Sequence, residues 1–144
     1  MCSTNQDCRC ISDILKIILI LQKKAHVVDD GLKTCDRKAL GGSCSCCVKY
    51  NTRPVQLFLV GQNGDDPLVM PTTRDAIDET TVFSNVFRVE KVDDCCATFR
   101  VLVPDKKCHD KHVDFEATNS FFTIDLRCVC IIRCLDDTFV DCVC

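Results

Sequence analysis

Several features that would point directly to a function are missing from this chain of 144 residues, whose formal net charge is −3. Lysine and arginine are scattered among acidic residues, and neither a basic stripe nor a pattern of stacking aromatics argues for nucleic-acid binding. No apolar run approaches the roughly 20 residues that a membrane span needs. No glycine-rich phosphate-binding loop is present. We therefore expect a soluble or particle-associated protein that binds neither nucleic acid nor membrane.

An export signal is not recognisable near the amino terminus either. Residues 14–21 (ILKIILIL) are apolar, but Asp7 and Asp13 precede them, and only Arg9 supplies positive charge. No small-residue cleavage site follows this stretch. The sequence therefore predicts synthesis in a cytosol without a signal peptide.

Cysteine is the residue that the chain has in excess, with 15 among its 144 residues. A content above about 8–10% in a short chain normally indicates a disulfide scaffold made for an oxidising compartment. Because no export signal is seen, we expect a protein that is made in a cytosol and used later where oxidation occurs. The count is odd, so pairing within one chain leaves at least one thiol for another molecule, a metal or no partner.

The hydrophobic pattern predicts a mostly β fold, namely an antiparallel β-sandwich-like single domain with an N-terminal α-helix and cysteine-bearing flexible tails. Helical spacing of apolar residues over 12–24 favours a helix capped by Ser12. Later runs alternate between apolar and polar residues and are separated by turn residues, among them Asp93 and Asp94, which predict a tight turn. After this turn, the alternation places Ala97, Phe99, Val101 and Val103 inward. The expected inner face of the helix comprises Ile11, Ile14, Leu15, Ile18 and Leu21. The expected strands cover residues 55–60, 68–70, 83–92, 97–103 and 121–134.

The chain divides by this pattern into three parts. Residues 1–11 form a cysteine-bearing N-terminal arm, residues 12–137 a single helix-plus-β-sandwich domain, and residues 138–144 a cysteine-bearing C-terminal tail. The tails matter because cysteines on mobile ends can reach a neighbouring molecule once subunits are packed side by side.

The cysteines fall into two groups of candidates. Adjacent pairs such as Cys95 and Cys96 cannot bond to each other without strain. Either each member has a different partner, or Cys96 is buried while Cys95 is a free thiol in a turn. In the expected strand over 121–134, Cys128, Cys130 and Cys134 occupy the same alternate positions as the apolar residues, which predicts that they face inward. They are either small buried residues or are bonded within the domain. The candidates for disulfides between subunits are Cys2, Cys8, Cys10, Cys44, Cys46, Cys47, Cys95, Cys142 and Cys144. The candidates for disulfides within the domain or for buried thiols are Cys35, Cys96, Cys108, Cys128, Cys130 and Cys134.

A structural zinc site is the alternative function. Cys44 and Cys47 have C-x-x-C spacing and could share a four-sulfur site with two cysteines of the last strand region. Cys108, His109 and His112 form another small cluster, but no second C-x-x-C or His pair completes a zinc-finger signature. Thiol catalysis is disfavoured, because the C-x-x-C does not open a helix of a βαβ unit and no group is evident that would orient His109. We expect no enzyme, no catalytic residue, no metal and no cofactor.

Two blocks of sequence resemble a known family. Residues 87–104 (FRVEKVDDCCATFRVLVP) and 121–137 (FFTIDLRCVCIIRCLDD) resemble matching stretches of the cysteine-rich outer spore-layer proteins. These are spore coat proteins Y and Z and exosporium protein Y of Bacillus-type endospores. Residues 51–59 (NTRPVQLFL) and the helix before a cysteine-rich region fit the same pattern, so the resemblance covers about residues 11–137.

The resemblance implies a structural protein that self-assembles into two-dimensional, roughly hexagonal lattices cross-linked by disulfides. Its partners would be further copies of itself, as a homohexamer extending into a lattice, and other spore coat or exosporium proteins. It would lie at the spore surface, in the outer coat, crust or exosporium basal layer, after synthesis in the mother-cell cytosol. Four cysteines match family cysteines, namely Cys96, Cys128, Cys130 and Cys134. Those that depart from the family pattern are Cys95, Cys44, Cys46, Cys47, Cys142 and Cys144.

Overall fold

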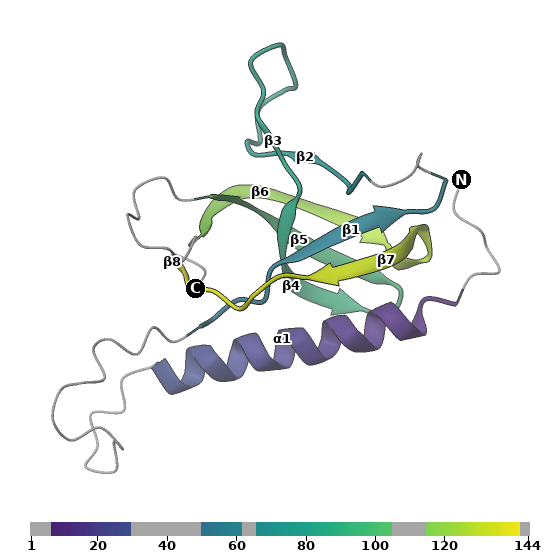
Figure 1. Cartoon of the computed structure of the whole chain (residues 1–144), viewed down its shortest axis with the longest axis vertical. Coiled ribbons are helices and arrows are strands. Elements are labelled where there is room, and N and C mark those ends of the chain that lie inside the picture. The colour runs from purple at the N-terminus through teal and green to yellow at the C-terminus, as the bar shows by residue number, and fades with distance from the viewer. Residues whose placement is uncertain (1–6, 30–49, 62–65, 105–114, 142–144) are drawn as a thin grey trace, which may run out of the picture.

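The computed structural model describes residues 7–29, 50–61, 66–104 and 115–141, with the side chains of residues 25–29 and 141 excepted. Strands predominate and one helix precedes them, which confirms the predicted mostly β fold with an N-terminal helix (Figure 1). The elements are α1 (Arg9–Asp29), β1 (Val55–Leu59), β2 (Met70–Pro71), β3 (Phe83–Ser84), β4 (Val86–Asp93), β5 (Cys96–Pro104), β6 (Phe115–Asp125), the 3₁₀ turn η2 (Leu126–Cys128), β7 (Val129–Cys134) and β8 (Val140–Asp141).

Six of the strands form one curled sheet in the order β7-β1-β4-β5-β6-β8. All neighbours are antiparallel except β6 and β8, which are parallel. Figure 1 shows β1 and β7 in front of β5 and β6, with α1 along one side of the sheet. The strands β2 and β3 pair only with each other and form a hairpin that projects from the domain on the side opposite α1.

The core lies between the curled sheet and α1. Three phenylalanines from neighbouring strands stand at its centre: Phe87 contacts Phe122 edge-on at 4.8 Å between ring centroids, and Phe99 stacks on Phe122 at 5.4 Å. Leu15 and Ile18 of α1 belong to the same buried cluster. The predicted alternation of β5 is confirmed from Ala97 to Val101, because Ala97, Phe99 and Val101 are buried. Val103, also expected inside, is half-buried, and Leu102 is buried instead, in a second cluster with Val86 and Val140.

The helix begins earlier and is rotated relative to the sequence prediction. It begins at Arg9, so Ser12 is not its cap; the Ser12 hydroxyl is buried and donates to the carbonyl of Asp94 at 2.7 Å. Ile14 and Leu21, expected inside, are 37% and 45% exposed. A polar residue can occupy the buried face when its hydrogen bonds are satisfied there. Within the described residues, no helix combines the length and the apolar character that a membrane span requires.

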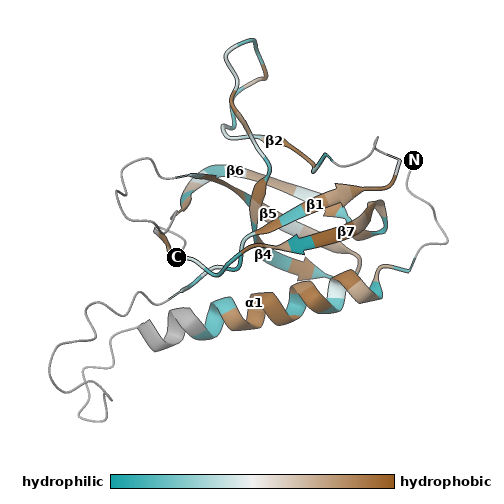
Figure 2. Cartoon of the chain, in the orientation of Figure 1, coloured by the Kyte–Doolittle hydropathy of each residue, from teal (hydrophilic) through white to brown (hydrophobic). Residues whose placement is uncertain are grey.

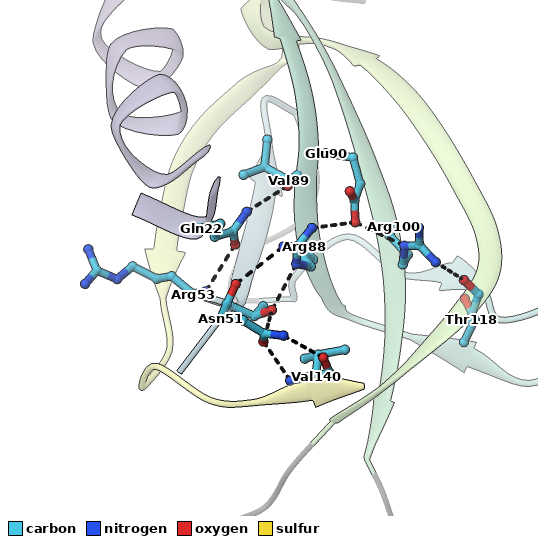
Figure 3. Close-up of polar contacts among 10 residues, drawn as sticks. Gln22, Asn51, Arg53, Arg88, Val89, Glu90, Arg100, Thr118 and Val140 are labelled. Atoms are coloured by element: carbon cyan, nitrogen blue, oxygen red, sulfur yellow. Dashed lines mark hydrogen bonds and ion pairs between the residues drawn. The ribbon is translucent and has the colours of Figure 1, made fainter. Parts of the chain in front are cut away.

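Buried polar side chains complete the fold where β1 and β4 diverge. These strands pair at a single position, Val55 with Phe87. In the gap beyond it, the buried amide of Gln22 donates to the Val89 carbonyl at 2.9 Å and accepts from the Arg53 backbone N–H at 3.1 Å (Figure 3). The helix therefore supplies hydrogen bonds that a continuous sheet would have made.

An arginine pair stabilises the outer side of the same region (Figure 3). The buried Arg88 donates to the Thr52 hydroxyl at 2.9 Å and to the carboxylate of Glu90 at 2.9 Å, and Arg100 donates to the same carboxylate oxygen at 3.0 Å. Asn51 continues the network through two hydrogen bonds to the backbone of β8. Arg88 and Arg100, which occupy polar positions of their expected strands, thus belong to a network that connects four separate segments.

Three strand predictions are wrong. Residues 83–92 are divided between β3 and β4, which belong to different sheets. Residues 121–134 form not one strand but two, because η2 reverses the chain between β6 and β7; the Asp125 carboxylate accepts from the Arg127 backbone N–H and stabilises this turn. Residues 68–70 do not form a strand along β1: the Leu68 backbone N–H donates to the Leu57 carbonyl at 2.7 Å, but β2 then pairs with β3. The domain boundaries stay a prediction, although folded elements extend outward to Arg9 and Asp141.

Candidate functional site: the cysteine positions

A disulfide between Cys8 and Cys95 connects the start of α1 to the β4–β5 turn. The turn is tight, as the sequence predicts, and Asp94 occupies it with a positive φ of 53°. The two α-carbons lie 5.7 Å apart, within the usual range for a disulfide. One helical turn further on, Ser12 bonds to the Asp94 carbonyl. Both residues were candidates for bonds between subunits, and the structure instead joins them within the chain.

The adjacent cysteines of this turn take separate roles, as the geometry of neighbouring cysteines requires. Cys95 faces the helix and is bonded, whereas Cys96 is exposed and free. Cys96 lies opposite Asp93 in β4 and Asp125 in β6. The expectation that Cys96 is buried or bonded within the domain is therefore wrong.

The cysteines after β6 also separate from one another. Cys128, in η2, is disulfide-bonded, and its place among the candidates for bonds within the domain stays a prediction. Cys130 and Cys134 are exposed and free, so the prediction that they face inward is wrong. The register between β1 and β7 shifts after Phe58, where Cys130 is the additional residue of β7, and this bulge changes which side chains face outward. Cys134 ends its strand, where little covers it.

Four of the described cysteines therefore carry free thiols, and all four are exposed. They lie on α1, at the β4–β5 turn and at the two ends of β7. Each is fixed on a helix, a strand or a turn of the folded domain rather than on a chain end. The four are Cys10, Cys96, Cys130 and Cys134.

Charged pairs stand beside two of these thiols. Arg127 bonds to the Asp125 carboxylate at 2.6 Å; this bond raises the pKa of Arg127 and lowers that of Asp125, and the nearby Cys96 contributes to the rise. Near Cys134, Arg53 forms a bidentate pair with Asp137 at 2.7 and 3.0 Å, which raises the pKa of Arg53. Both free thiols thus lie at charged, solvent-facing positions that a neighbouring molecule can reach.

The remaining candidates lie outside the described residues. This applies to Cys2, Cys35, Cys44, Cys46, Cys47, Cys108, His109, His112, Cys142 and Cys144. The zinc alternative rests on Cys44 and Cys47 and stays a prediction for that reason. Across the part of the chain that the structure covers, no three histidine, cysteine or acidic side chains are grouped so that they could hold a metal ion.

The sequence analysis missed the exposure of the thiols because it continued the inward–outward alternation of β6 into β7, although η2 interrupts it. The pattern Asp125-x-Arg127 was the available indication of a turn, since an aspartate that bonds to the backbone two residues on is typical of turns. The sequence analysis also assigned no structure to residues 71–82, which form most of the projecting hairpin.

Comparison with known proteins confirms the expected resemblance. The family model for spore coat protein Z matches residues 2–137, which is nearly the whole chain. No curated protein and no solved structure matches it. The chain belongs to the spore coat protein Z family.

Proposed function

We propose that this protein is a self-assembling structural component of an outer spore layer, in the crust or the exosporium. In this proposal cyclic oligomers, hexamers by family resemblance, join into a two-dimensional lattice that disulfides then cross-link. Family membership supports the structural role in the spore coat. Other spore coat or exosporium proteins would be further partners of the lattice.

The observation that carries the proposal is the set of four exposed free thiols on the folded surface. A subunit with two cross-linking positions can extend only a chain, whereas a sheet needs contacts in at least three directions. Thiols fixed on rigid elements also restrict which thiol of a neighbour they can reach, because a disulfide requires α-carbons within about 7 Å. The folded surface, and not the chain ends alone, is therefore suited to cross-linking an ordered array.

Oxidation would follow non-covalent assembly. Each new disulfide forms when two thiols lose two protons and two electrons to an external oxidant such as dioxygen. Such bonds do not persist in a reducing cytosol, but they do persist outside it. Weak contacts could thus set the order of the array before covalent bonds make it permanent. The internal bond between Cys8 and Cys95 would form under the same oxidising conditions and hold α1 to the β4–β5 turn.

Negative-stain electron microscopy tests the proposal. The purified protein is imaged as isolated and again after strong reductant with heat. We expect ordered arrays in the first sample and their dissociation in the second. Monomers in both samples would contradict self-assembly and favour a client of another scaffold or the zinc-binding alternative, which metal analysis of reductant-purified protein would then decide.

Two matched variants separate the surface thiols from the chain ends. The first replaces four surface cysteines by serine: Cys10, Cys96, Cys130 and Cys134. The second replaces three cysteines near the termini by serine: Cys2, Cys142 and Cys144. Resistance of the arrays to boiling in detergent is compared with the unaltered protein. The surface variant should form arrays that dissociate without reductant; full resistance in this variant would show that the surface thiols do not cross-link the lattice.

A further inference from the structure

The hairpin of β2 and β3, with the loop between them, exposes apolar side chains from its paired strands to its loop. Ile77 is 67% exposed, Val82 63% and Phe83 46%. Figure 1 shows the hairpin extending away from the sheet, and Figure 2 shows hydrophobic residues along it. A small domain gains nothing within itself from apolar residues held away from its core. The hairpin therefore has the character of a contact with another molecule.

Hydrogen bonds give the hairpin a defined shape. The Asp78 carboxylate accepts from the Thr80 backbone N–H at 2.8 Å and from the Thr80 hydroxyl at 2.6 Å, and the Asp78 backbone N–H donates to the Thr81 hydroxyl at 2.9 Å. At the base, the Ser120 hydroxyl of β6 donates to the Pro71 carbonyl at 2.7 Å. An ordered projection can dock with little loss of conformational entropy.

A second unpartnered apolar surface lies on α1. We call it the outer face of α1, and it consists of Ile14, Ile17, Ile20 and Leu21, which are 37%, 58%, 52% and 45% exposed. Residues three and four positions apart are neighbours on a helix, so these side chains form a continuous strip. No described residue covers this strip fully, and Figure 2 shows the hydrophobic residues along the helix.

The two surfaces carry opposite charge. Exposed residues of the hairpin loop give it a net charge of −2: Arg74, Asp75, Asp78 and Glu79. Exposed charged residues of the first four turns of α1 give it +3: Arg9, Asp13, Lys16, Lys23 and Lys24. Two outer faces would repel each other, and so would two hairpins, whereas a hairpin and an outer face attract. Charge and apolar character together select one pairing.

We propose that the hairpin of one copy docks on the outer face of α1 in the next copy. The inference rests on the proposed self-assembly and names the non-covalent contact that precedes cross-linking. Because the hairpin and α1 lie on opposite sides of the domain, a single neighbour cannot engage both (Figure 1). Each copy therefore contacts two others head to tail, an arrangement that closes into a ring or continues as an open array.

Charge reversal provides the test. The hairpin variant carries Asp75→Lys and Glu79→Lys; the helix variant carries Lys16→Glu, Lys23→Glu and Lys24→Glu. Sedimentation velocity over a range of protein concentrations, in reductant, measures non-covalent association. Each variant alone should need at least tenfold more protein to associate. An equimolar mixture should associate as the unaltered protein does, because each hairpin then meets an outer face of opposite charge.

The outcomes separate the two proposals. Two outcomes would overturn the contact between hairpin and helix while leaving self-assembly intact. In the first, each variant alone associates normally. In the second, the mixture stays dissociated although both variants are folded by circular dichroism. An unaltered protein that is folded in reductant by circular dichroism and stays monomeric at all concentrations would overturn both. As an apolar control, Ile77→Ser should weaken association, whereas Ile131→Ser, on β7 and 54% exposed, should not.

Discussion

Removing the disulfide between Cys8 and Cys95 should reveal how far this protein depends on a covalent bond within its own domain. The bond joins residues 87 positions apart and ties α1 to the β4–β5 turn. Replacing both cysteines by alanine avoids leaving one unpaired thiol that could exchange with others. The variant should fold into the same structure with a lower free energy of unfolding.

The expected loss follows from the length of chain that the bond encloses. For a closed loop of this size, the entropy removed from the unfolded chain corresponds to about 4–5 kcal/mol at 25 °C. Whole domains are usually stable by only about 5–15 kcal/mol. The double variant should therefore retain a small margin of stability, and its α1 should separate from the sheet more readily than in the unaltered protein.

Urea unfolding followed by far-UV circular dichroism measures the difference in the absence of reductant. Cys10→Ala is the matched control, since that thiol lies on the same helix but is exposed and free. Reductant should destabilise the unaltered protein by at least as much as the double substitution, because Cys128 is disulfide-bonded too. A double variant within about 0.5 kcal/mol of the control would refute the reasoning, since that is the usual effect of a neutral surface change.

Three further outcomes are expected. Gln22→Met should lower the free energy of unfolding by about 1–3 kcal/mol for each of the two backbone groups left without a partner, whereas Lys23→Met on the exposed side should have little effect in the same urea titration. Phe87→Ala should cost about 3–5 kcal/mol in that assay, because its ring fills the centre of the core. The pKa of Asp78 is lowered, and the largest cause is the hydrogen bond that its carboxylate accepts from the Thr80 hydroxyl. Order in the hairpin loop is therefore present above the usual carboxyl pKa of about 3.9 and is lost as the pH falls through the lowered value; Thr80→Val should move the Asp78 pKa, measured by NMR titration, upward.

Local patterns were sufficient where the burial of a residue follows from its place in a regular element. The alternation of residues 97–101 predicted the inward side chains of β5, and two consecutive aspartates predicted the turn before it. The same method failed at residues 121–134, because the 3₁₀ turn from Leu126 to Cys128 interrupts the inward–outward alternation between β6 and β7. It failed again on α1, where the periodicity identified a helix but not which apolar strip meets the sheet. Because α1 has apolar residues on more than one side, its packing against the sheet decides which side faces the core.

The sequence by itself determined the chemistry of the protein: an odd and high number of cysteines, a mostly β fold with one preceding helix, and the blocks that place it in a spore coat family. The tertiary structure alone decided the roles of individual cysteines. A disulfide requires two α-carbons within about 7 Å, and nothing in the order of residues indicates that positions 8 and 95 satisfy this. Folding brings Cys95, in the turn, to the helix and leaves Cys96, the first residue of β5, exposed to solvent. Two neighbours of identical chemistry therefore have different roles because of where the fold places them.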